Sequence, residues 1–223
     1  MPGDGNADQV ASTNAQRQAY IIDDDNDVRK SLHFLLAAKS ITAWPFATSV
    51  DFIDHLPDLQ PAPVLLDIRM PDIDGLQVLS LLRERAVTWP VIVITAHADV
   101  TIAVRAMKLG AIEFLEKPFA PEMLDQALDQ AFGILRETEL ALRARNDARR
   151  LIDGLSKRER EIVTIMLEGV PNKLSAHRLG LSTRTVEMHR GNALAKLGAK
   201  SILEVVALME TADLHTSVAP LQS

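Results

Sequence analysis

The feature that most constrains the fold is a regular alternation of short apolar runs with amphipathic segments between residues 19 and 133. Apolar residues recur at helical spacing within the amphipathic segments, first at Val28, Leu32, Leu35 and Leu36. The apolar runs are short and continuous, as expected of strands that are buried on both faces of a parallel sheet. The segment therefore predicts an α/β doubly wound five-stranded parallel sheet. Its predicted strands are 20–22, 41–44, 64–66, 91–95 and 112–115.

Polar side chains of a particular kind stand at the ends of these predicted strands. Asp23 and Asp24 follow the first strand, Asp67 follows the third, Thr95 ends the fourth, and Lys117 comes after the fifth. Ligands of such sheets bind beyond the carboxyl ends of the strands. Three nearby carboxylates repel one another unless a cation neutralises them, and oxygen ligands suit Mg²⁺. Since a carboxylate can also accept a phosphoryl group, the pattern predicts a Mg²⁺-assisted aspartyl-phosphate site.

The alternation of strand and helix patterns is absent after Leu155, and residues 155–210 predict an all-α domain of four short helices. Ser156 and Glu159 have the spacing of a capping box, as do Ser201 and Glu204. The longest helix is expected at 183–197, after Ser182 as N-cap and before Gly198. Residues 155–210 hold nine basic and six acidic residues, whereas the whole chain has a net charge of −6. This asymmetry indicates an anionic partner for the second domain, unless it is chance variation between domains.

The segments outside the two predicted domains are expected to form two terminal extensions and a linker. Residues 1–18 are expected to be a disordered extension, 136–154 a charged helical linker, and 211–223 a frayed tail. Leu128, Leu135 and Leu142 are seven residues apart, a weak coiled-coil signal, so an exposed helix that extends the preceding one is favoured. With no Cys, disulfides and thiolate sites are excluded, and no apolar run is long enough to span a membrane.

The motifs at the strand ends resemble the receiver domain of bacterial response regulators. The resemblance covers residues 19–135 and implies the strand order 2-1-3-4-5. The segments that carry it are Asp23-Asp24-Asp25 with Arg29, Asp67-Ile68-Arg69-Met70-Pro71 with Asp74-Gly75, Thr95-Ala96-His97, and Phe114-Leu115-Glu116-Lys117-Pro118-Phe119.

This resemblance implies a role for each matching residue. Asp67 is expected to accept the phosphoryl group, and Thr95 and Lys117 to sense it. Asp23, Asp24, Asp67 and the backbone carbonyl of Arg69 are expected to hold Mg²⁺. Phe114 is expected to be an aromatic switch, although its spacing equally suits an ordinary core residue of a strand. The Lys117–Pro118 bond is expected to be cis.

The second domain resembles a LuxR-type helix-turn-helix over residues 155–210, on the segments Leu155–Ile162, Glu168–Lys173, Leu181–His189 and Asn192–Gly198. A helix-turn-helix lays its second helix in the major groove, here residues 183–197. Val186, Ala193 and Leu197 are expected to face the core. The residues expected to face outward are Arg184, Glu187, Met188, Arg190 and Gly191. The residues expected to contact phosphates are Lys173, Arg178, Lys196 and Lys200. Glu187 has an alternative role as an ion-pair partner of Arg184 or Arg190.

Taken together, the two domains resemble the FixJ/NarL type of response regulator. The resemblance implies a bacterial, cytoplasmic transcription factor that is not an enzyme and has no membrane contact. Its partners would be a histidine kinase, double-stranded promoter DNA and, when phosphorylated, a second copy in a homodimer, or phosphorylation would release the DNA-binding domain. Three alternatives are a phosphorylation-independent DNA-binding protein, a phosphate sink, and a Mg²⁺-dependent phosphatase. The phosphatase lacks its second carboxylate, because Arg69 stands where such enzymes repeat the Asp.

Overall fold

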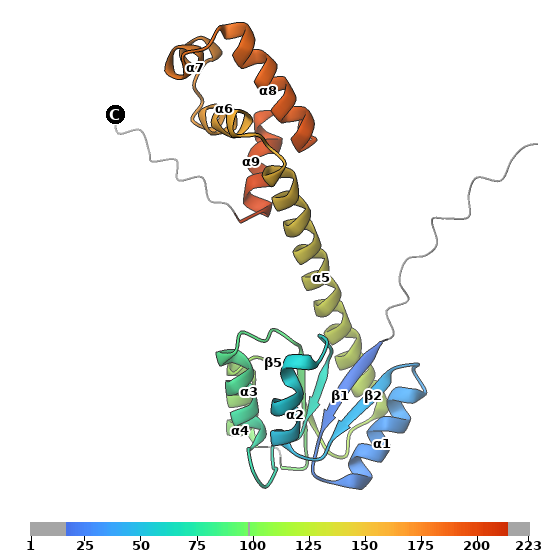
Figure 1. Cartoon of the computed structure of the whole chain (residues 1–223). Helices are drawn as coiled ribbons and strands as arrows, with labels where there is room; N and C mark the ends of the chain where they lie inside the picture. The colour runs from blue at the N-terminus through green and yellow to red at the C-terminus, as the bar shows by residue number, and fades with distance from the viewer. Residues whose placement is uncertain (1–16, 98, 214–223) are drawn as a thin grey trace, which may run out of the picture. The chain divides into compact units, whose positions relative to one another are not determined.

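The structure, a computed structural model, describes residues 17–97 and 99–213. The first sixteen residues of the predicted extension and the part of the predicted tail from residue 214 onward lie outside the described residues. The chain divides into two compact units between Glu137 and Thr138. Figure 1 shows both units and labels their α-helices and several of the strands.

The first unit is a five-stranded parallel sheet in the order β2-β1-β3-β4-β5, which confirms the predicted fold and strand order. Its strands are β1 (Gln18–Ile22), β2 (Thr42–Phe46), β3 (Val64–Leu66), β4 (Val91–Thr95) and β5 (Ala111–Glu116). Its helices are α1 (Asn26–Ala37), α2 (Ser49–His55), the 3₁₀ helix η1 (Leu56–Asp58), α3 (Gly75–Glu84), α4 (Val100–Lys108) and the first part of α5 (Pro121–Asp153).

Side chains of the strands alternate between two hydrophobic clusters, one on each face of the sheet. Leu66 of β3 belongs to the cluster that holds Phe52 of α2 and Leu79 of α3. Its neighbour Leu65 belongs to the cluster that includes Leu36 of α1 and Leu128 of α5. Since successive residues of a strand point to opposite faces, the apolar run can fill both layers.

The second strand differs from the prediction. It runs over Thr42–Phe46 and not over 41–44, because the Ile41 amide donates to the Leu36 carbonyl at the end of α1. The strand also contains Pro45, which β2 tolerates as an edge strand.

The second unit contains the four predicted helices, α6 (Lys157–Leu167), α7 (Asn172–Leu179), α8 (Thr183–Leu197) and α9 (Ile202–Thr211). Ser182 caps α8, and Gly198 ends it with a φ of 65°, as predicted. At α9, the Glu204 carboxylate accepts from the Lys200 amide and not from Ser201, so the expected capping box is only half formed.

The core of this unit begins earlier in the chain than residue 155. Helix α5 is continuous to Asp153, as favoured for the linker, but Ala148 and Ile152 near its end are each 2% exposed. They pack in one cluster with residues of α6, α8 and α9. Arg149 also donates to the Ala212 carbonyl at 3.0 Å, so the chain just after α9 is held against α5.

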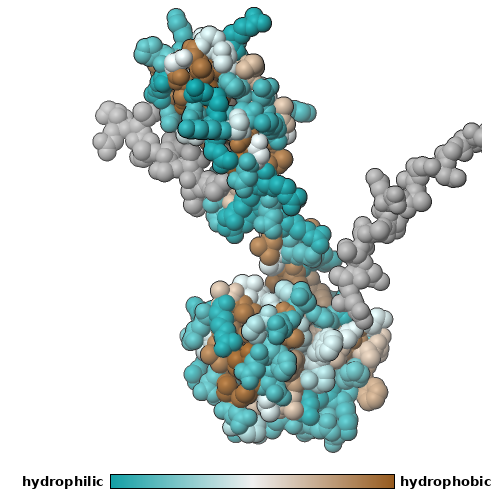
Figure 2. All heavy atoms as spheres, in the orientation of Figure 1, coloured by the Kyte–Doolittle hydropathy of each residue, from teal (hydrophilic) through white to brown (hydrophobic). Residues whose placement is uncertain are grey.

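The middle of α5 has a mainly hydrophilic surface (Figure 2). No helix in the described part of the chain is both long and apolar enough to cross a membrane.

Candidate functional site

The register of the sheet brings Asp23 and Asp67 together. Ile22 of β1 pairs with Leu66 of β3, and each carboxylate residue directly follows its strand. The Asp67 amide donates to the Ile22 carbonyl at 2.8 Å, which extends the pairing by one residue. Strands β2 and β3 lie on opposite sides of β1, so the two aspartates stand at the topological switch point, where such sheets bind ligands.

Lys117, which follows β5, joins these two carboxylates. Its ammonium lies 2.6 Å from Asp23 Oδ2 and 3.3 Å from Asp67 Oδ1. The Lys117 amide donates to the Thr95 carbonyl, and the Lys117–Pro118 bond is cis, as the resemblance implied. Four of the five predicted polar residues therefore meet at one edge of the sheet: Asp23, Asp67, Thr95 and Lys117.

Burial gives this cluster its electrostatic character. Asp23 is 2% exposed, Asp67 is 7% exposed, and the Thr95 side chain is fully buried. Burial is the largest influence on the pKa of Asp67 and raises it. Lys117 lowers this pKa by less than burial raises it, the nearby Asp23 carboxylate adds a smaller upward shift, and the pKa remains above its usual value. One lysine is thus shared by two buried carboxylates, which leaves a negative charge that a further cation would neutralise.

The donor chemistry fits Mg²⁺, because the predicted ligands are all oxygen atoms. Asp67 already has a fixed orientation, since its Oδ2 accepts from the Arg69 amide at 3.0 Å. Asp24, by contrast, is exposed. Among the described residues, no three acidic or histidine side chains come close enough to hold a metal together. Asp24 is therefore the one predicted ligand residue whose side chain the structure does not bring into the cluster.

Gly75 lets α3 begin directly beside the Asp67 backbone. The Gly75 amide donates to the Ile68 carbonyl at 2.8 Å. A Cβ atom at residue 75 would stand 2.3 Å from the Asp67 carbonyl oxygen. Sequence reasoning noted this glycine only within its motif, beside Asp74, which the structure shows to cap α3.

Phe114 stands on β5 two residues before Glu116, the residue that pairs with Thr95, and α4 begins at Val100, five residues after Thr95. Thr95 accepts from the His97 amide through its hydroxyl oxygen at 3.2 Å. Phe114 is partly buried and packs against the cluster that includes Val93 and Ala106. On α4, Val100 is 81% exposed, and Val104 and Met107 are each 47% exposed. Hydrophobic residues reach the surface on the side of the first unit that carries α3 and α4 (Figure 2).

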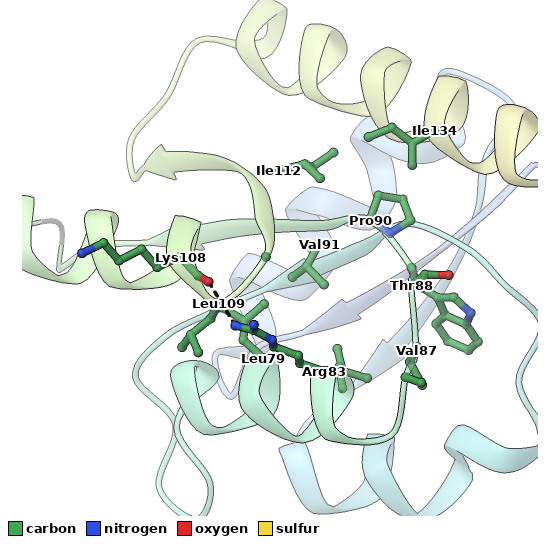
Figure 3. Close-up of a pocket in the computed structure, with 14 residues that line it drawn as sticks. Leu79, Arg83, Val87, Thr88, Pro90, Val91, Lys108, Leu109, Ile112 and Ile134 are labelled. Carbon is green, nitrogen blue, oxygen red and sulfur yellow. Dashed lines mark hydrogen bonds between the residues drawn. The ribbon is translucent and has the colours of Figure 1, made fainter. Parts of the chain in front are cut away.

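A hollow of about 370 Å³ lies elsewhere, around the starts of β4 and β5. Val91, Ile112 and Ile134 line it, and Arg83 reaches from α3 to donate to the Lys108 carbonyl at 3.5 Å (Figure 3). The Lys108 ammonium points away from the hollow. Among the residues that the structure describes, no carboxylate or histidine lines it. It is therefore separate from the acidic cluster, which stands at the opposite ends of the strands.

Helix α8 has the two faces expected of it. Val186, Ala193 and Leu197 are buried. Arg184, Glu187 and Met188 are exposed, whereas Arg190 is partly buried and donates to the Asn172 side chain at 3.1 Å. Within the described residues, Glu187 forms no ion pair with either predicted arginine partner.

The cations predicted to contact phosphates differ in their surroundings. Lys173 and Lys200 are exposed. The Arg178 guanidinium pairs with Glu168 at 2.8 Å, and the Lys196 ammonium lies 2.7 Å from Glu159 Oε2. Sequence reasoning assigned Glu159 only the capping of α6, because the two residues are 37 positions apart and no local pattern connects them.

Comparison with known families matches two models to the chain. Residues 19–129 match the response regulator receiver domain, and residues 153–209 match the luxR family of bacterial regulatory proteins. The two matches coincide with the sheet unit and with the helices α6–α9.

Similar proteins align with this chain over most of its length and of their own. The transcriptional regulatory protein FixJ of Rhizobium meliloti is 39% identical over 85% of this chain and 93% of its own. The C4-dicarboxylate transport transcriptional regulatory protein DctR of Rhodobacter capsulatus is 40% identical over 85% of this chain and 97% of its own. The structure of the response regulator StyR is 34% identical, with a TM-score of 0.77 over 88% of this chain and 99% of its own. The chain therefore belongs to the FixJ-type response regulators, the transcriptional regulators of two-component systems that join a receiver domain to a LuxR-type DNA-binding domain.

Proposed function

We propose that Asp67 accepts a phosphoryl group from a histidine kinase. The single observation that carries this is the Lys117 ammonium, which bridges the buried carboxylates of Asp23 and Asp67. An Asp67 oxygen attacks the phosphorus of a phosphohistidine, and the O–P bond forms as the P–N bond breaks. The electron pair of the broken bond stays with the imidazole nitrogen. Lys117 then lies within reach of the phosphoryl oxygens.

Asp23, Asp24, Asp67 and the Arg69 carbonyl are the proposed Mg²⁺ ligands. Bound Mg²⁺ would supply positive charge that offsets the carboxylates and the incoming phosphoryl group. Asp24 stands next to Asp23 in the chain, so a change in its side-chain conformation is what this ligand set requires. The Arg69 amide holds one Asp67 oxygen, which leaves the other for transfer once Lys117 moves to the phosphate.

Phosphorylation adds about 1.5 to 2 negative charges and strong acceptor oxygens at Asp67. We expect the Thr95 hydroxyl and Lys117 to turn towards these oxygens. Phe114 lies on β5, the strand paired with β4, which ends at Thr95. When the Thr95 side chain turns towards the phosphoryl group, the Phe114 ring would move into the space that Thr95 leaves. The exposed apolar residues of α4 support residues 98–119 as the face through which two copies form a homodimer. Release of the DNA-binding domain is the alternative output.

For promoter DNA, α8 is the proposed recognition helix. Arg184, Glu187, Met188 and Arg190 would meet base edges, and the expected phosphate contacts are Lys173, Lys196 and Lys200. The exposure of Arg184, Glu187 and Met188 supports this assignment. A dimer would match two half-sites separated by about one helical turn of DNA or a multiple of it.

The deciding experiment is light scattering on a sizing column, with and without beryllofluoride and Mg²⁺. Beryllofluoride mimics a phosphoryl group on a carboxylate. We expect dimerisation in the wild type and none in Asp67→Asn. Dimerisation that persists in Asp67→Asn would refute Asp67 as the acceptor, and monomers in every condition would favour domain release over the dimer.

A further inference from the structure

Glu159 makes contacts with two helices of the DNA-binding unit. Its Oε2 atom accepts from the Ser156 amide at 2.8 Å and from the Lys196 ammonium at 2.7 Å. The first contact caps α6, and the second reaches the last turn of α8. Among the described residues, this is the one ion pair that joins α6 to α8.

The carboxylate of this pair is buried, whereas its lysine partner is not. Glu159 is 4% exposed, and the Lys196 side chain is 48% exposed. The Lys196 ammonium and, next, the Ser156 amide lower the pKa of Glu159 to about 2, so its carboxylate is ionised at neutral pH. Moving Lys196 away would leave a buried, ionised carboxylate without its cation, which is costly. Lys196 is thus poorly placed to exchange Glu159 for a DNA phosphate.

Because Lys196 lies near one end of α8, a change in helix angle at Lys196 displaces the proposed recognition residues at the other end. Lys196 and Arg184 are 12 positions apart on one helix, a distance of about 18 Å at 1.5 Å per residue. A tilt of only a few degrees at the Lys196 end therefore moves Arg184 by about 1 Å. Base contacts depend on such distances, because bidentate hydrogen bonds in the major groove have narrow geometry.

We propose that Glu159 and Lys196 are positioning residues for sequence recognition: their ion pair fixes the angle at which α8 presents Arg184 and Glu187 to DNA. The proposal rests on the function assigned to α8 above. It also removes Lys196 from the residues expected to contact phosphates, and it leaves Lys173 and Lys200 in that role.

The two roles of Lys196 differ in a measurable way. A phosphate contact contributes about 0.9 to the slope of log affinity against log salt, and it strengthens binding to every sequence equally. A positioning residue contributes nothing to that slope. Its loss lowers the ratio of specific to non-specific affinity, by about tenfold where one bidentate base contact is misaligned.

The test uses the full chain with beryllofluoride and Mg²⁺. The probes are a DNA duplex selected in vitro by the wild type and a scrambled duplex of the same length, titrated across a range of salt concentrations. Lys196→Gln and Glu159→Gln are the test variants, and Gln at 159 keeps an acceptor for the Ser156 amide. Lys200→Gln is the matched control, since Lys200 is an exposed lysine just after the same helix. Lys196→Arg is the conservative variant that keeps the charge.

We expect Lys196→Gln and Glu159→Gln each to lower the affinity ratio about tenfold at an unchanged salt slope, with Lys196→Arg close to wild type. Lys200→Gln should lose about 0.9 of slope at an unchanged ratio. The proposal is overturned if Lys196→Gln behaves as Lys200→Gln does. Should Glu159→Gln fail to fold, as judged by circular dichroism, Lys196→Gln and Lys196→Arg still decide between the two roles.

Arg184→Ala separates this proposal from the function on which it rests. A lowered ratio in Arg184→Ala with an unchanged ratio in Lys196→Gln refutes only the positioning role. An unchanged ratio in both variants refutes α8 as the helix that reads the sequence, and the positioning role falls with it.

Discussion

Replacing Gly75 by Ala tests the geometry of the proposed phosphorylation site without removing any of its polar groups. The added Cβ atom would stand 2.3 Å from the Asp67 carbonyl oxygen and 2.9 Å from the Ile68 Cα atom. Ordinary contacts begin at 3.4 Å, so the Asp67 backbone or the start of α3 must move by about 1 Å. Both neighbours are backbone atoms, which cannot rotate out of the way as a side chain can.

A displacement of about 1 Å at a reacting group costs on the order of 100-fold in rate. We therefore expect Gly75→Ala to accept a phosphoryl group from acetyl phosphate on the order of 100-fold more slowly than the wild type. The overpacking should also cost about 1–3 kcal/mol of stability. Phosphate-affinity gel electrophoresis measures the rate of phosphorylation, and urea unfolding measures the stability.

Gly133→Ala is the matched control, because Gly133 lies within α5 and its added Cβ would meet nothing within 4 Å. That variant should keep the wild-type rate and gain up to about 1 kcal/mol, since Ala suits a helix interior better than Gly. If Gly75→Ala is phosphorylated as fast as the wild type and is equally stable, the close approach of α3 does not position Asp67.

Three further predictions address charge, the domain boundary and the dimer. Burial raises the pKa of Asp67, so its ionisation opposes folding. Without Mg²⁺, Asp67→Asn should therefore be more stable than the wild type in urea at pH 7, and this gain in stability should disappear as the pH falls below about 4. A gain that does not depend on pH would contradict the prediction. Ile152→Ala should destabilise the second unit by about 2–5 kcal/mol in thermal unfolding, whereas Leu151→Ala, at an exposed neighbouring position, should cost much less. Val104→Asp should abolish dimerisation in beryllofluoride while leaving the rate of phosphorylation unchanged, and a persistent dimer would move the interface away from α4.

The sheet and the convergence of its polar residues could be predicted because both follow from local patterns. An apolar run such as 91–95 marks a buried strand by itself, and parallel strands bring their carboxyl ends to one edge. The boundary of β2 could not be predicted in this way. Ile41 is apolar and buried like a strand residue, but its amide closes the end of α1, which only the folded chain reveals.

Ion-pair partners that are far apart in the chain could not be predicted from the sequence. Lys196 and Lys200 are both lysines near the end of α8, and charge pattern gives them the same expected role. Only the packing of α6 against α8 places a buried carboxylate beside Lys196 and none beside Lys200. Asp24 makes the same point in the receiver unit, because its motif matches a metal ligand while its side chain remains exposed.

The predicted linker contributes more to the hydrophobic cores than its sequence indicates. Its charge pattern suggests a spacer, and the leucines at 128, 135 and 142 suggest a weak coiled-coil seam. Leu128, however, is 1% exposed and packs in the core of the receiver unit, so it is not available to a partner helix. Further along α5, Ala148 and Ile152 fill the core of the DNA-binding unit. One continuous helix therefore belongs to both cores, and a truncated DNA-binding domain that begins at residue 155 would lack part of its own core.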